Sequence, residues 1–150
     1  IPSDQETSIV HGDFRLDNMI FDPITHEVKA ILDWELSTLG NPIADFTYHM
    51  MSWRLPAGAK GLGMMGSDLK SLNIPSESEY AELYYKKTGR EKIDNWDFYM
   101  AYNIFRLAGI AQGIVGRVRD GTASSSEAKN YEAFVPILGK LGWSIVEGIK

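Results

Sequence analysis

Three oxygen-bearing side chains near the start of the chain could together perform metal-assisted chemistry. Asp13 and Asn18 stand two and seven residues after His11, and Asp33 follows an apolar run further along. An aspartate held in a tight loop can accept a proton from an attacking hydroxyl, and carboxylate and amide oxygens are the ligands that Mg²⁺ prefers. We therefore interpret Asp13 as a candidate base and Asn18 and Asp33 as candidate magnesium ligands. His11 is expected to be a packed, hydrogen-bonded brace.

Short strands and loops are predicted around these side chains. Brief runs rich in β-forming residues cover residues 7–10, 19–21 and 28–32. Pro and Asp in the connector 22–27 indicate a hairpin loop. Asp13 and Asn18 are thus expected in a loop between strands, and Asp33 at the end of the last strand.

The rest of the chain is expected to be helical, apart from an irregular stretch rich in Gly, Met and Ser over residues 56–75. Helices are predicted from Pro42, from a capping box at Ser76 to Gly89, from about Asn95 to Asp120, and from Ser124–Glu127 onward. The last of these is expected to be interrupted near Pro136 and Gly139. No internal repeat or linker divides the sequence.

The spacing of His11, Asp13 and Asn18 is that of the catalytic loop of protein kinases, which keep a magnesium-binding aspartate at the position of Asp33. A shuffled chain of this composition would contain the spacing about 0.008 times, so chance is a weak explanation. Arg15 stands where many kinases place a lysine. It could contact a transferring phosphate or form a surface ion pair, and both remain open.

Residues 9–48 resemble the catalytic segment of the aminoglycoside phosphotransferase and choline-kinase-like family. The nearest branch is found alone in bacteria and fused to some acyl-CoA dehydrogenases. The match is carried by residues 11–18, 32–36, 40–42 and 45, with softer similarity over 74–90, 95–99 and 120–126. The resemblance implies that Asp13 is the catalytic base, that Asn18 and Asp33 bind metal, and that Asp45 is a buried brace for the loop.

The same resemblance implies an α+β, protein-kinase-like C-terminal lobe, mostly α-helical with short strands and a hairpin near the catalytic loop. Residues 1–150 are expected to form this lobe alone, because they contain no glycine-rich strand pair and no strand lysine with its glutamate partner. A formal glycine pattern at 61–66 follows no predicted strand and is rejected as a nucleotide loop. Two departures from protein kinases are Gly12, where many have Arg, and Trp34-Glu35, which replaces Phe-Gly.

The predicted function is ATP- and Mg²⁺-dependent transfer of a γ-phosphoryl group to a hydroxyl of a small molecule. In the dehydrogenase-fused branch, the implied acceptors are hydroxyacyl-CoA thioesters. Residues 1–150 alone are expected neither to bind ATP tightly nor to turn it over. The alternatives are a non-catalytic pseudokinase-like binding module, a metal-dependent hydrolase, and polar residues that merely cap turns. The acceptor and the oligomeric state stay open.

Composition removes several other classes of function. The net charge of −5 argues against a surface built to bind nucleic-acid phosphates or anionic lipid. The absence of cysteine excludes disulfide scaffolds and thiolate chemistry, and a cytoplasmic location is expected. Residues 1–6 show no signal-peptide pattern. The least polar stretch, 98–116, carries Asn103, Arg106 and Gln112, so a buried helix is favoured over a membrane span.

Overall fold

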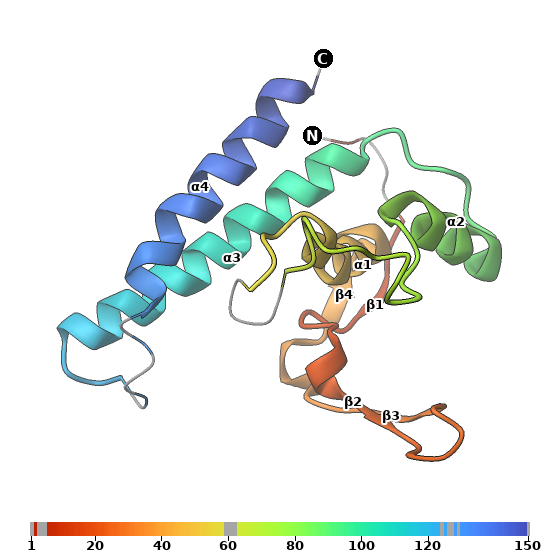
Figure 1. Ribbon diagram of the computed structural model, residues 1–150, viewed down its shortest axis with the longest axis horizontal. Helices are drawn as coiled ribbons and strands as arrows, with labels where there is room; N and C mark the ends of the chain where they lie inside the picture. Colours follow the sequence, from red (N-terminus) through yellow and green to blue (C-terminus); the bar gives the residue numbers. More distant parts are fainter. Residues whose placement is uncertain are drawn as a thin grey trace. The chain divides into compact units, whose positions relative to one another are not determined.

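Two separate antiparallel strand pairs and a helix form the first third of the computed structural model (Figure 1). The structure describes residues 2, 6–58, 63–123, 125, 128 and 130–149. Strand β1 (Ser8–Val10) pairs with β4 (Thr38–Gly40), and β2 (Met19–Phe21) pairs with β3 (Val28–Ile31). The hairpin and the three predicted strands are therefore confirmed, whereas β4 is a strand that the sequence reasoning did not predict.

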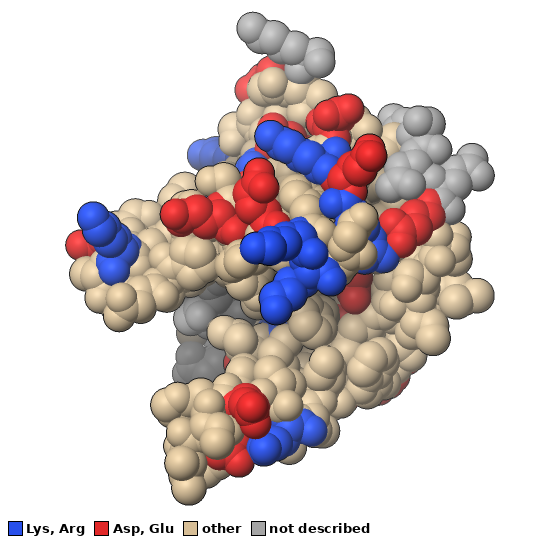
Figure 2. Space-filling view, turned by 90° about the vertical axis from the view of Figure 1, so that its right-hand side faces the viewer, with Lys and Arg blue, Asp and Glu red and all other residues tan. Residues whose placement is uncertain are grey.

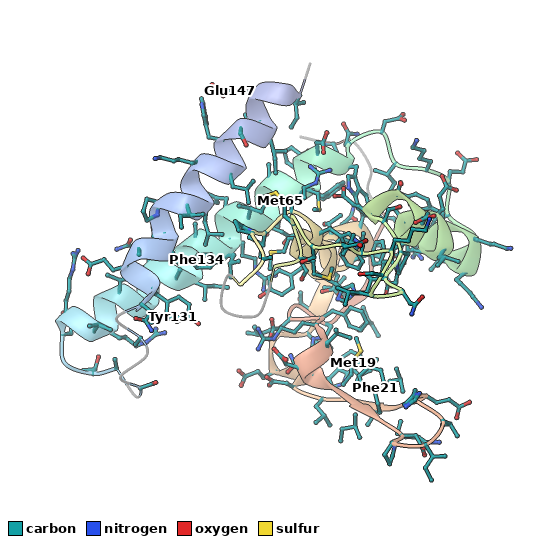
Figure 3. All side chains as sticks on the ribbon, viewed as in Figure 1. Met19, Phe21, Met65, Tyr131, Phe134 and Glu147 are labelled. Carbon is teal, nitrogen blue, oxygen red and sulfur yellow. The ribbon has the colours of Figure 1, made fainter. Side chains whose placement is uncertain are left out.

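The loops between the strands contain two single turns of 3-10 helix. The first, η1 (Leu16–Asn18), leads directly into β2, and the second, η2 (Trp34–Leu36), lies between β3 and β4. Apolar side chains on the β2–β3 hairpin, including Phe21, are half exposed, and Figure 3 labels Met19 and Phe21 on β2. The loop residues between β1 and β2 and those after β3 carry the candidate site.

Helix α1 (Pro42–Met50) begins where the sequence predicted it. The side chain of Asn41 accepts a hydrogen bond of 2.8 Å from the backbone N–H of Ile43, which satisfies one of the free donors of the first turn. Ile43 and Met50 are fully buried, so this short helix is held mainly by its packing. It presents Asp45, in its first turn, to the loop described below.

The chain divides into two compact units, Ile1–Met50 and Met51–Lys150. The second contains η3 (Met51–Trp53), α2 (Glu77–Thr88), α3 (Trp96–Arg119) and α4 (Tyr131–Gly148). The predicted capping box is confirmed, because the Ser76 hydroxyl accepts from the Glu79 N–H while the Glu79 carboxylate accepts from the Ser76 N–H. Gly89 ends α2 in the left-handed conformation, with φ of 70°.

Helices α3 and α4 lie side by side along their length (Figure 1). Ile104 and Leu138 are fully buried, and Phe134 (labelled in Figure 3) is buried too. A Cβ added at Gly142 would lie 3.4 Å from Ile104, so the helices approach closely there. The predicted start of this last helix at 124–127 lies largely outside the described residues, as do residues 61–62 of the rejected glycine pattern.

The predicted interruption of α4 near Pro136 and Gly139 is wrong, because the helix continues through both. Proline removes one backbone donor, whose partner would be the carbonyl of Glu132. Both Pro136 and Glu132 are exposed, so water can satisfy that carbonyl. Packing of the opposite face of α4 against α3 then outweighs the local preference against proline.

A cluster of charged side chains ties the start of α2 to the start of α3. Arg54 donates to the Glu77 carboxylate at 2.6–3.1 Å and to Asp97 at 2.6 Å, and the Trp96 indole donates to Glu77 at 2.7 Å. Burial alone would lower the pKa of Arg54, but its hydrogen bonds to Glu77 and Asp97 raise that pKa above its ordinary value. The Arg54 guanidinium therefore stays charged beside these partners.

Acidic and basic side chains lie interspersed on the face shown in Figure 2. Within the described ranges, no helix combines the length and the apolar character that crossing a membrane would need.

Candidate functional site

His11 is the buried centre of the loop that follows β1, with 3% of its surface exposed. Its Nδ1 accepts a hydrogen bond from the Asp13 N–H at 3.2 Å, and its Nε2 lies 2.8 Å from the Leu32 carbonyl oxygen. Because Nδ1 is an acceptor, the ring proton sits on Nε2 and is donated to Leu32. His11 thus joins the loop containing Asp13 to the end of β3.

Asp45 fixes the same loop from helix α1. Its two carboxylate oxygens accept hydrogen bonds from the backbone N–H groups of His11 at 2.8 Å and Gly12 at 2.9 Å. The side chain is partly rather than fully buried. Such charge-assisted bonds are among the stronger ones in proteins, so Asp45 holds the backbone immediately before Asp13.

Gly12 has a conformation that only glycine adopts readily. Its φ is +83°, and an added Cβ would lie 2.5 Å from the carbonyl oxygen of Leu36. The loop therefore passes directly against the turn η2. This close approach was not predicted, although a glycine between two candidate site residues was itself a signal of it.

Asp13 and Asn18 lie side by side. The Asn18 amide nitrogen donates to the Asp13 carboxylate at 3.0 Å and to the Asp13 carbonyl at 2.9 Å. These bonds fix the orientation of the amide and leave Oδ1 of Asn18 without a hydrogen bond to any described residue. A carboxylate oxygen and an amide oxygen are thus both open to a ligand.

Asp33 follows β3 in a left-handed conformation, with φ of 64° and ψ of 53°. A non-glycine residue in that region costs roughly 1–2 kcal/mol. Its exposed carboxylate forms no hydrogen bond or ion pair within the part of the chain that the structure describes. The preceding residue, Leu32, donates from its N–H to the Asn18 carbonyl at 2.8 Å. The backbone segments that carry the two predicted metal ligands are therefore bonded to each other.

These oxygens fit a hard divalent cation that also binds phosphate. Asn18 supplies an amide oxygen, and Asp33 supplies a carboxylate without a protein partner among the described residues. In the described ranges, no three His, Asp or Glu side chains gather closely enough to hold a metal ion by themselves. Mg²⁺ commonly takes one or two protein ligands and completes its shell with phosphate and water oxygens.

Arg15 forms the ion pair that was one of its two predicted roles. Its Nη2 lies 3.0 Å from the Asp17 carboxylate, and its Nε lies 3.7 Å from that of Asp13. The Nε atom is buried and makes no hydrogen bond to the described residues. The guanidinium therefore lies beside the candidate base with one donor unused.

Aromatic rings surround His11. The Trp34 ring lies 4.7 Å from the His11 ring between centroids, and the Phe14 ring lies 6.1 Å from it. Phe14 also contacts His49 at 5.7 Å, and burial lowers the pKa of His49. Trp34 had no predicted role, and its position next to Asp33 was the available signal.

Comparison with known proteins shows the family to which this chain belongs. Residues 1–83 match the family model APH, described as the phosphotransferase enzyme family. The chain belongs to this family, and its fold is kinase-like and α+β.

A solved structure from Ralstonia eutropha JMP134, of a candidate aminoglycoside phosphotransferase, is 49% identical with a TM-score of 0.89. It matches 96% of this chain, which covers 44% of that protein. Mouse acyl-CoA dehydrogenase family member 10 is 45% identical over 95% of this chain, and human family member 11 is 37% identical over 93%. The chain spans only 14% and 18% of these two relatives.

Proposed function

We propose that the complete protein transfers the γ-phosphoryl group of ATP to a hydroxyl of a small molecule, with Mg²⁺ as the cofactor. The observation that carries the proposal is the Asp13–Asn18 pair, bonded through the backbone of Asn18 to the segment that carries Asp33. One group can accept a proton while the other two offer oxygens to a cation. This division of roles is what phosphoryl transfer requires.

In the proposed reaction, the hydroxyl oxygen of the acceptor forms a bond to the γ-phosphorus of ATP. Asp13 accepts the proton that this hydroxyl loses. The bond from that phosphorus to the β–γ bridging oxygen breaks, and ADP leaves with the electron pair. Asn18 and Asp33 would hold Mg²⁺, which neutralises charge on the phosphates. Arg15, beside Asp13, is placed to stabilise the negative charge that develops on the transferred group.

The nucleotide is proposed to bind mainly outside residues 1–150. In the described part of this chain, no strand pair carries a glycine-rich turn with an adjacent lysine, and the similar solved structure is more than twice as long. We propose that residues 1–150 are the C-terminal lobe and that another part of the protein supplies the clamp for ATP.

A hydroxyacyl-CoA thioester is proposed as the acceptor. Support comes from the resemblance to the dehydrogenase-fused branch and from the acyl-CoA dehydrogenase family members among the relatives.

The test uses the complete protein and measures ADP formation with hydroxyacyl-CoA, choline, sugar and aminoglycoside acceptors. Asp13→Asn should lower kcat by about 10²–10⁴-fold, the usual contribution of a positioned base. Asp33→Ala should abolish Mg²⁺-dependent turnover. Asp22→Asn, which changes a carboxylate of the β2–β3 hairpin, is the matched control and should keep its kcat.

Three results would contradict the proposal. Near-normal turnover in both Asp13 and Asp33 variants would remove their assigned roles. Binding of Mg²⁺ and ATP without turnover of any acceptor would indicate a pseudokinase-like module. Phosphate release from phosphate esters without ATP would indicate a metal-dependent hydrolase.

A further inference from the structure

The left-handed conformation of Asp33 is held from the residue before it. Leu32 uses both of its backbone polar groups, donating to the Asn18 carbonyl at 2.8 Å and accepting from His11 Nε2 at 2.8 Å. The entry of the chain into Asp33 is therefore fixed. The direction of the Asp33 side chain then depends on how the next residue, Trp34, is held.

Trp34 closes this turn from the other side. Its indole Nε1 donates to the carbonyl of Ile31 at 2.8 Å, so the side chain bridges back over Leu32 and Asp33. Its ring packs at 4.7 Å on the His11 ring, which is itself bonded to Leu32. The backbone bonds of Leu32 and the side-chain contacts of Trp34 therefore hold the chain before and after Asp33.

Core packing alone does not account for this arrangement. Trp34 lies outside the buried core, since 47% of its surface is exposed. Its polar atom, in contrast, is fully used, in a bond that spans the one left-handed aspartate in the described chain. The half-exposed Trp34 side chain, with its indole N–H bonded to Ile31, is therefore better suited to fix the turn at Asp33 than to stabilise the core.

We propose that Trp34 is a positioning residue that aims the Asp33 carboxylate at the metal. This inference rests on the proposed function, because it takes Asp33 as a magnesium ligand. The indole N–H, bonded to the Ile31 carbonyl, holds the turn in which Asp33 is left-handed. Partners that orient a ligand from behind typically contribute 10–100-fold to metal affinity or activity.

Two phenylalanine variants separate positioning from packing. Trp34→Phe keeps a ring against His11 and removes only the donor to Ile31. Trp143→Phe is the matched control, because the Trp143 indole also makes a local hydrogen bond, to Glu147 at 2.9 Å, on an exposed part of α4. Both variants lose one indole hydrogen bond, and only one of these bonds spans Asp33.

The experiment measures Mn²⁺ binding to the complete protein with a non-hydrolysable ATP analogue, from the loss of the free Mn²⁺ signal in electron paramagnetic resonance. Trp34→Phe should weaken Mn²⁺ binding by about 10–100-fold. Its affinity for the analogue without metal and its Tm should match the wild type. Trp143→Phe should match the wild type in all three measurements.

Each other outcome has a defined meaning. Unchanged Mn²⁺ affinity in Trp34→Phe overturns the positioning role and leaves the proposed function intact. Equal losses in Tm, analogue binding and metal binding show a structural role and also overturn it. If the wild type binds no Mn²⁺ with the analogue, the proposed function fails together with this inference.

Discussion

The carboxylate of Asp45 accepts a hydrogen bond of 2.8 Å from the backbone N–H of His11, 34 residues earlier in the chain. A second bond reaches the next N–H, that of Gly12. A helix side chain thereby determines the path of the backbone that presents Asp13. The geometry of the candidate base is thus decided by a residue that lies outside its loop.

Asp45→Asn should disturb this loop while the helix remains. An amide offers one acceptor where the carboxylate offers two, so one backbone N–H loses its partner, and the expected loss of stability is about 1–3 kcal/mol. Turnover by the complete protein should fall as Asp13 moves. Chemical denaturation and initial rates measure the two effects.

Asp22→Asn is the control for Asp45, because Asp22 also accepts two backbone N–H bonds, from Ile24 and Thr25. Both bonds reach the same oxygen, Oδ1, so the side-chain amide of the variant can keep them. The variant should lose less stability than Asp45→Asn and keep its turnover, and equal losses of turnover in both variants would contradict the assigned role of Asp45.

Gly12→Ala should be more destabilising than an ordinary glycine substitution. The positive φ alone costs roughly 1–2 kcal/mol, and contact of the new Cβ with the Leu36 carbonyl adds to this. Gly66→Ala isolates the conformational cost, because Gly66 has a φ of +90° and open space around it. Denaturation midpoints should separate the two variants, and equal midpoints would show that the loop moves away from η2 at no cost.

Arg15 and Asp17 test the two roles left open by the sequence. Asp17→Asn removes an exposed ion pair and should change the free energy of unfolding by less than about 1 kcal/mol. Arg15→Gln should lower kcat by about 10²–10³-fold if its guanidinium stabilises the transferred group. An Arg15→Gln variant with unchanged kcat would leave the ion pair as its complete role.

His49 should make stability depend on pH near neutrality. Burial lowers its pKa below the ordinary 6.5, so below that pH the unfolded chain binds a proton that the folded chain does not. Stability is therefore full above about pH 6.5 and declines as the pH falls, by at most about 1.4 kcal/mol per pH unit. His49→Gln should flatten the curve measured between about pH 7 and 5.5, whereas His26→Gln, in the exposed hairpin turn, should keep the slope.

Local sequence signals predicted the elements that are stabilised locally. The capping box at Ser76, the proline after Asn41 and the glycine that ends α2 each act within a few residues, and each predicted boundary is confirmed. Strand β4 is only three residues long and exists because it pairs with β1, about thirty residues away. Helix α4 likewise continues through Pro136 because it packs against α3, and a local sequence pattern cannot show such packing.

For the candidate site too, the sequence predicted the local features and not the long-range contacts. Residue types and spacing were enough to select His11, Asp13, Asn18 and Asp33 from one sequence. The contacts that shape the site join residues distant in the chain, such as His11 with Trp34 or Gly12 with Leu36. Spacing cannot show such contacts, since they form only after the strands and α1 have been placed.

Both nitrogens of the His11 ring are already committed, one receiving the Asp13 N–H and the other giving its proton to Leu32. The imidazole therefore has no free atom with which to carry a proton away. In the proposed reaction, a proton accepted by Asp13 would therefore leave with the product or pass to water rather than through His11.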